Sequence, residues 1–128
     1  MSLFRRPQVI LFSDDVSGVA AFYSRLGFSE TFRVPEEGEP IHVDLALDGY
    51  KLGIASVAST RDDHGLDPIP EGQRMAVVLW TDDTAAGLDA VIDAGGTRLS
   101  PPSPWLGRLL IAWAADPDGN PIQIVQQD

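Results

Sequence analysis

The stretch VILFSDD at residues 9–15 and the stretch VVLWTDD at residues 77–83 share one pattern. Each is a short β-prone apolar run that ends in residues suited to cap a helix. The offset of 68 residues between the two stretches also separates the glycines that follow the predicted helices, Gly27 and Gly95. Because one offset aligns both the caps and the helix stops, the sequence predicts an internal duplication.

The first half of the chain predicts a strand, a helix and three further strands. Apolar residues from Val16 to Leu26 recur at helical spacing, and Gly27 stands where a left-handed helix stop is expected. Asp48 and Gly49 form a good hairpin signal. The strands are predicted over residues 8–12, 29–34, 42–47 and 50–55.

The second half repeats this order. Asp82, Asp83 and Thr84 form the predicted helix cap, and an apolar helix face follows that ends at Gly95 and Gly96. The strands are predicted over residues 75–81, 97–100, 109–115 and 121–126.

These elements predict an α+β fold of two βαβββ modules, residues 7–56 and 75–127. A chain of 128 residues fits a single domain, so one domain over residues 1–128 is expected. Residues 57–74 are polar, contain several Gly and Pro residues and show no period, which is typical of a linker between modules.

The composition excludes several classes of function. A net charge of −10 and a pI near 4.4 oppose binding to nucleic acid or to an anionic membrane surface. The apolar run at residues 109–115 is too short to cross a bilayer. Without cysteine the chain has no disulfide, no thiolate metal site and no cysteine nucleophile. No signal-peptide pattern opens the sequence, so we expect a cytoplasmic protein.

Three pieces of sequence carry a family resemblance: Phe22-Tyr23 and Leu26-Gly27-Phe28 in the first half, and the turn DPDGN at residues 116–120 before the last strand. Together with the paired modules, they make residues 7–127 similar to the vicinal oxygen chelate superfamily. Its members include glyoxalase I, extradiol dioxygenases and bleomycin resistance proteins. The resemblance implies the glyoxalase/bleomycin resistance fold, in which a curved mixed sheet surrounds a cleft.

The resemblance also implies four positions that decide whether a metal binds. In the metal-dependent members, the first and last strands of each module supply His, Gln or Glu ligands. Here these positions are Gln8, Gly53, Ala76 and Gln123. Two neutral amides without a carboxylate are a poor donor set for a hard divalent ion. We therefore expect no metal and no cofactor.

Two polar side chains are predicted to face the cleft from one strand. His42 and Asp44 alternate with the apolar residues Val43, Leu45 and Leu47, which would face the helix. The pair has three interpretations: it binds a polar group of a ligand, it acts as an acid and a base, or it is a structural hydrogen-bonded pair. His64, the other histidine, falls in the predicted linker.

Aromatic residues complete the predicted cleft. Phe12 shares a strand face with Gln8, Trp80 shares one with Ala76, and Trp105 falls in a predicted loop over residues 100–107. Flat apolar walls with a few polar groups suit an aromatic ligand, although each tryptophan could instead belong to the core. The predicted ligand-binding residues are Gln8, Phe12, His42, Asp44, Trp80, Trp105 and Gln123, and no catalytic residue is assigned.

The resemblance and these residues predict a metal-free protein that binds a small, aromatic-containing molecule, acting as a homodimer. An example of such a function is the sequestration of a drug, as in bleomycin resistance proteins. The alternative is an enzyme of the same superfamily, namely a lyase, an isomerase or a dioxygenase, and a scaffold that has lost its ligand is a third possibility.

Overall fold

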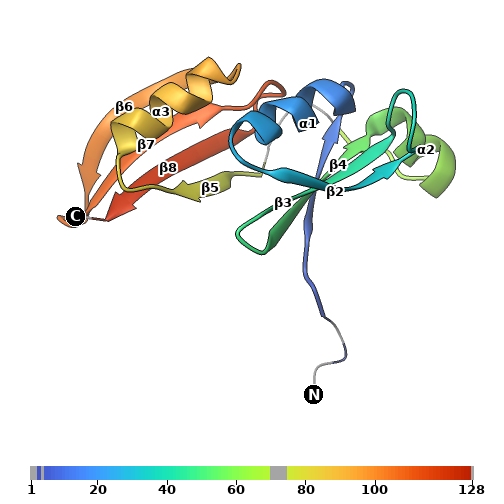
Figure 1. Ribbon diagram of the computed structural model, residues 1–128, viewed down its shortest axis with the longest axis horizontal. Helices are drawn as coiled ribbons and strands as arrows, with labels where there is room; N and C mark the ends of the chain where they lie inside the picture. Colours follow the sequence, from blue (N-terminus) through green and yellow to red (C-terminus); the bar gives the residue numbers. More distant parts are fainter. Residues whose placement is uncertain (1–2, 4, 70–74, 128) are drawn as a thin grey trace. The chain divides into compact units, whose positions relative to one another are not determined.

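The computed structural model describes residues 3, 5–69 and 75–127. The chain divides into two units, Met1–Pro70 and Glu71–Asp128, and each is described by itself. Figure 1 shows that each unit contains one four-stranded sheet with a helix along one of its faces.

The first unit holds one mixed sheet. Its strands lie in the order β1-β4-β3-β2, with β1 parallel to β4 and the other neighbours antiparallel. The elements are β1 (Val9–Ser13), α1 (Val16–Arg25), β2 (Ser29–Val34), β3 (His42–Leu47), β4 (Tyr50–Ser56) and α2 (Val57–His64).

The second unit repeats this topology. Its strands lie in the order β5-β8-β7-β6, again with one parallel pair, between β5 and β8. The elements are β5 (Val77–Trp80), α3 (Thr84–Asp93), β6 (Thr97–Trp105), β7 (Leu109–Ala115) and β8 (Pro121–Gln127).

Helix α1 begins and ends where the sequence predicts. The Asp15 carboxylate accepts the backbone N–H of Gly18 at 3.0 Å, which satisfies a donor that the first turn leaves unpaired. Gly27 follows the helix with a φ of +108°, in the left-handed region that favours glycine. The buried residues of α1 include Phe22 and Tyr23, whose rings meet edge to face.

The apolar side of α1 packs on one face of its sheet. Val43 and Leu45 on β3 and Ile54 on β4 are fully buried on that face. Because strand side chains alternate, His42 and Asp44 lie on the opposite face. The packing of α1 therefore covers one face of the sheet, and the polar side chains of β3 lie on the other face.

Helix α3 takes the same role in the second unit. Asp83 caps it by accepting the backbone N–H of Ala86 at 3.1 Å. Its buried Leu88 and Val91 face the sheet, where Ile122 and Ile124 are buried as well.

The DPDGN turn is a tightly bonded connection between β7 and β8. One carboxylate oxygen of Asp116 accepts the backbone N–H groups of Asp118 and Asn120, and the other accepts the Asn120 side-chain amide at 2.8 Å. Asp116 and Asn120 are both 3% exposed. The Asp116 carboxylate of the motif thus has a structural role, because both of its oxygens bond within the turn.

The sequence prediction was wrong for the start of the stretch 57–74, which is helix α2 over Val57–His64. The Ser56 side chain caps this helix by accepting the Ser59 N–H at 3.2 Å, and Gly65 ends it in the left-handed region. Only Val57 and Thr60 are buried, so no apolar stripe marks the helix in the sequence. Residues 70–74 of the predicted linker lie outside the described residues.

Strand boundaries also differ in places. Strand β1 begins at Val9, so Gln8 directly precedes it, and β5 covers only residues 77–80 of the predicted 75–81. Strand β6 extends to Trp105, so the prediction of a loop over residues 100–107 was wrong for most of its length, which includes Pro101, Pro102 and Pro104. They are tolerated because β6 is an edge strand that pairs only with β7 and carries irregularities in its register.

The predicted α+β class with two βαβββ modules is confirmed. The cleft that the resemblance implies stays a prediction. Within the described residues, every helix is too short and too polar to cross a membrane.

Candidate functional site

The face of the first sheet opposite α1 brings residues from all four strands into one row. Strand pairing places Ile10 beside Gly53, Gly53 beside Asp44, and Asp44 beside Phe32. Paired residues in neighbouring strands point to the same side of a sheet. A residue at the centre of this row therefore contacts its neighbours on both sides.

Asp44 in this row forms a hydrogen-bonded set with two further side chains, those of Gln8 and His42. The Gln8 amide Nε2 donates to Oδ1 of Asp44 at 2.7 Å, and Nε2 of His42 lies 2.7 Å from the same oxygen. A carboxylate only accepts, so both nitrogens donate. The side chains of His42 and Asp44 are 26% and 17% exposed, so the pair is partly shielded but open to a ligand.

Gly53 makes room for this set. A Cβ at this position would lie 3.0 Å from Gln8 Nε2, 3.1 Å from Asp44 Oδ1 and 3.2 Å from Ile10 Cγ1. These distances are shorter than comfortable carbon contacts. The hydrogen bond between Gln8 and Asp44 therefore occupies the space above Gly53 that a side chain would fill.

Apolar side chains surround the polar set. The ring of Phe32 meets the ring of His42 with a centroid distance of 6.2 Å and an interplanar angle of 64°. Phe32 is 52% exposed, and Ile10 and Val34 on the same face are also exposed. Phe12, half-buried, lies on this face because Ala55 pairs with both Phe12 and His42. Such a face can hold a ring and a polar group together.

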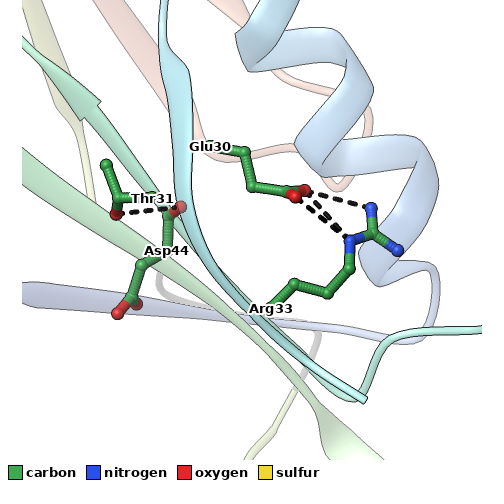
Figure 2. Close-up of polar contacts among 4 residues, drawn as sticks. All are labelled: Glu30, Thr31, Arg33 and Asp44. Atoms are coloured by element: carbon green, nitrogen blue, oxygen red, sulfur yellow. Dashed lines mark hydrogen bonds and ion pairs between the residues drawn. The ribbon is translucent and has the colours of Figure 1, made fainter. Parts of the chain in front are cut away.

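The opposite side of β2 carries an unrelated ion pair. Figure 2 shows Glu30 and Arg33 on the α1 side of β2, with the Asp44 carboxylate extending away from them. The Arg33 guanidinium donates to the Glu30 carboxylate at 3.0 and 3.2 Å, and this hydrogen bond raises the pKa of Arg33. The backbone oxygen of Asp44 accepts the Thr31 hydroxyl at 3.4 Å, whereas the carboxylate takes no part in this contact. The carboxylate of Asp44 is thus left to Gln8, His42 and a ligand.

The second sheet has its own aromatic face, opposite α3. Gln123 in β8 pairs with Val78 on one side and with Trp113 on the other, so the three side chains share that face. Trp80, two residues after Val78, is 66% exposed, and Trp105 at the end of β6 is 56% exposed. A shallow depression of about 330 Å³ lies beside the indole of Trp80. It is lined by Trp80, Thr81, Asp82 and Gln127.

The predicted ligand-binding residues thus fall into two groups. Gln8, Phe12, His42 and Asp44 lie on one face of the first sheet, and Trp80, Trp105 and Gln123 lie on one face of the second. Sequence reasoning missed Phe32 and could not assign a face to Trp113. Both are placed by the pairing register between strands, which local alternation does not contain.

The four family metal positions do not fit a divalent ion. Gly53 and Ala76 have no side-chain donor atom, and Gln8 and Gln123 offer only neutral amide oxygens. Among the described residues, no group of three or more His, Asp or Glu side chains is arranged to hold a metal. A hard cation needs several oxygen or imidazole ligands with compensating charge, which this donor set lacks.

Several solved structures share the fold of this chain. The hypothetical protein SA1046 from S. aureus is 18% identical, with a TM-score of 0.80 over 98% of this chain and 95% of that one. A glyoxalase-related enzyme from Fulvimarina pelagi is 24% identical, with a TM-score of 0.80 over 98% and 89%. A bleomycin-binding protein complexed with bleomycin is 24% identical, with a TM-score of 0.64 over 98% and 100%.

No curated protein matches the chain significantly. Family membership rests on the sequence itself, which matches one family over residues 5–124, nearly its whole length. The chain belongs to the Glyoxalase/Bleomycin resistance protein/Dioxygenase superfamily.

Proposed function

We propose that this protein binds a small aromatic molecule, without a divalent metal, and thereby sequesters it. The observation that carries the proposal is the set of Gln8, His42 and Asp44 within an exposed apolar face. An apolar surface with a few convergent polar groups is the usual composition of a small-molecule site. The polar set gives a ligand its orientation, and the surrounding rings give it contact area.

The second sheet supports the same proposal through its tryptophans. An exposed indole offers a flat apolar surface on which the ring of a ligand can stack. Trp80 and Trp105 are both more than half exposed on one face. A flat ring can stack on such side chains, so we assign this face to ligand binding as well.

The superfamily and the charge of the chain narrow the class of ligand. A bleomycin-binding protein shares the fold, which is consistent with capture of an antibiotic or an aromatic metabolite. With a net charge of −10, the protein favours a cationic ligand over an anionic one at low ionic strength.

The proposal includes a cytoplasmic homodimer. In each sheet the outer strands, β1 and β2 or β5 and β6, pair with only one neighbour of that sheet. Unpaired edges and exposed apolar faces are commonly covered by a second copy of the same chain. Sedimentation at micromolar concentration should then show twice the chain mass of 13.8 kDa.

A ligand panel tests the binding function. Antibiotics and aromatic metabolites are screened by thermal shift, since a ligand that binds only the folded state raises the melting temperature. For each hit, calorimetry compares the parent protein with Trp80→Ala and Phe32→Ala, one variant for each face. We expect each variant to lose on the order of 2 kcal/mol of binding free energy when its face contacts the ligand.

Tyr50→Ala is the matched control, because Tyr50 is an exposed aromatic residue at the β3–β4 hairpin and alternation places it on the α1 side of the first sheet. Its affinity should equal that of the parent. Hits whose affinity is the same in the parent and in both face variants would contradict the proposed site, and a panel without hits would contradict the proposed ligand class.

A further inference from the structure

The hydrogen bond between His42 and Asp44 determines which imidazole nitrogen is basic. Oδ1 of Asp44 accepts from Nε2 of His42 at 2.7 Å and also from the Gln8 amide at 2.7 Å. An oxygen that accepts two hydrogen bonds has no proton of its own to donate, so the shared hydrogens belong to the two nitrogens. The proton of neutral His42 is therefore held on Nε2, and Nδ1 keeps its lone pair.

The lone pair of Nδ1 is not used within the fold. Among the described residues, the Asp44 carboxylate is the only hydrogen-bond partner of the His42 ring. The imidazole is also partly exposed, on the face assigned above to ligand binding. A nitrogen with a free lone pair, oriented from behind by a carboxylate, is the arrangement that general-base catalysis requires.

The surroundings of His42 favour proton transfer to an aromatic substrate. Phe32 lies beside the imidazole with a centroid distance of 6.2 Å, and Phe12 lies on the same face, separated from His42 by Ala55 of β4. These rings can hold a planar molecule against the histidine. Once His42 has taken a proton, the adjacent Asp44 carboxylate offsets the positive charge of the imidazolium.

We propose that His42 is a general base that removes a proton from a carbon acid attached to an aromatic ring. Nδ1 takes the proton, the electron pair of the C–H bond passes into the substrate, and Asp44 and Gln8 act as positioning residues. The proposal rests on the proposed binding face and adds a reaction to it. It needs no oxidant and no metal.

Nitrobenzisoxazole is a suitable probe, because one base converts it into a coloured product. The base removes the proton from the ring carbon, the C–H electron pair forms the second π bond of a nitrile, and the N–O bond breaks to leave a phenolate. His42 then releases the proton to water. The rate is followed by the absorbance of the nitrophenolate.

The two histidines of the chain provide the variant and its control. His42→Gln removes the base, and His64→Gln changes an exposed residue at the end of α2. We expect kcat/KM to fall about 100-fold in His42→Gln, within the range of general-base contributions, and to stay unchanged in His64→Gln. A parent value no higher than that of His42→Gln would overturn the proposal.

Asp44→Asn tests the positioning role. The substitution keeps the size of the side chain but removes the acceptor-only carboxylate that holds the proton on Nε2. We expect kcat to fall at least 10-fold, as for a base with the wrong tautomer, while KM and the melting temperature stay near those of the parent. A fall in kcat that is accompanied by a clear fall in melting temperature would instead assign Asp44 a purely structural role and overturn this part of the proposal.

Failure of this reaction is distinguishable from failure of the proposed function. Probe binding is measured separately, by calorimetry with the parent protein and with Phe32→Ala. A probe that binds the parent more tightly than Phe32→Ala and is turned over no faster than by His42→Gln overturns the general base and leaves the binding function standing.

Discussion

Gly53 decides what the first sheet presents on its open face. In metal-dependent relatives, the resemblance implies a ligand at this position, whereas here the missing side chain leaves room for Gln8 and Asp44 to meet at 2.7 Å. A carboxylate thus reaches this place from the neighbouring strand β3 instead of from β4. The Asp44 carboxylate already accepts hydrogen bonds from an imidazole and an amide. This arrangement suits an organic ligand better than a metal cation.

Gly96 is needed for a different reason, namely the close packing of backbone and side-chain atoms around it. This packing allows a prediction about stability. A Cβ there would lie 2.7 Å from Val91 Cγ1 and only 2.8 and 2.9 Å from the backbone oxygens of Ala115 and Val91. Backbone atoms in a helix and a strand cannot move aside cheaply. Gly96→Ala should lower the free energy of unfolding by about 2 kcal/mol, as overpacking does.

Urea unfolding followed by circular dichroism measures this loss. Gly53→Ala is the control for overpacking, because the closest groups at Gly53 are the ends of side chains that can shift. A glycine in a strand is itself unfavourable by about 0.5–1 kcal/mol, so the control should change stability little. Equal destabilisation of the two variants would contradict this explanation.

The two capped helices are matched elements, and each can be tested against the other. Asp15 and Asp83 each accept the backbone N–H of the residue three positions later, at 3.0 and 3.1 Å. Substitution of either residue by Ala should cost about 1 kcal/mol of unfolding free energy, and substitution by Asn only a few tenths, because Asn also caps helices.

Thermal and urea unfolding of the four variants measure these losses. Asp14→Ala is the control, since the capping contact of α1 is made by its neighbour Asp15. A loss in Asp14→Ala as large as in Asp15→Ala would show that charge near the helix end, and not the hydrogen bond, stabilises α1.

Elements with a local signal were predictable from the sequence. The caps, the glycine stops and the Asp48–Gly49 hairpin each depend on a few adjacent residues, and the structure has all of them. Helix α2 was not predictable by its periodicity, because it buries only Val57 and Thr60 and has no apolar stripe. The end of β6 was missed because its prolines are compatible only with an edge strand, and strand order is not a local property.

The part of the candidate site that depends on one strand was predictable, and the part that depends on pairing between strands was not. Alternation along β3 placed His42 and Asp44 on one face, and the structure brings them within 2.7 Å. Phe32 was missed because its place beside Asp44 depends on the register between β2 and β3, which includes an irregularity between Glu30 and Phe32. The contact of Gln8 with Asp44, 36 residues apart, is likewise set by pairing of distant strands.

Across the whole molecule, the two duplicated units share one fold but carry different side chains on the sheet face opposite the helix. The two units repeat one sheet order and one capped helix, and their open faces nevertheless differ. The first carries an imidazole and a carboxylate among apolar residues, and the second carries exposed indoles and an amide. The helix-packed faces preserve the fold, so the open faces are free to carry the features that distinguish one superfamily member from another.

The donor set of the whole chain leads to the last prediction, which concerns metal content. Metal-dependent members of such a family use a cation to polarise substrate oxygens, a contribution of several kcal/mol that neutral amides do not replace. The four positions here are Gln8, Gly53, Ala76 and Gln123. We expect the purified protein to carry no stoichiometric divalent metal and to lack glyoxalase activity. Elemental analysis after expression in medium supplemented with zinc and nickel measures this directly.

Gln123→Glu is the informative variant for the same prediction. It adds one carboxylate at a family metal position, but Gly53 and Ala76 still contribute no donor atom, so metal content should stay at background. Near one metal per chain in the parent protein, removed by a chelator together with any activity, would contradict the metal-free proposal. Metal in the variant alone would instead show that the remaining donors need a single added charge to complete a site.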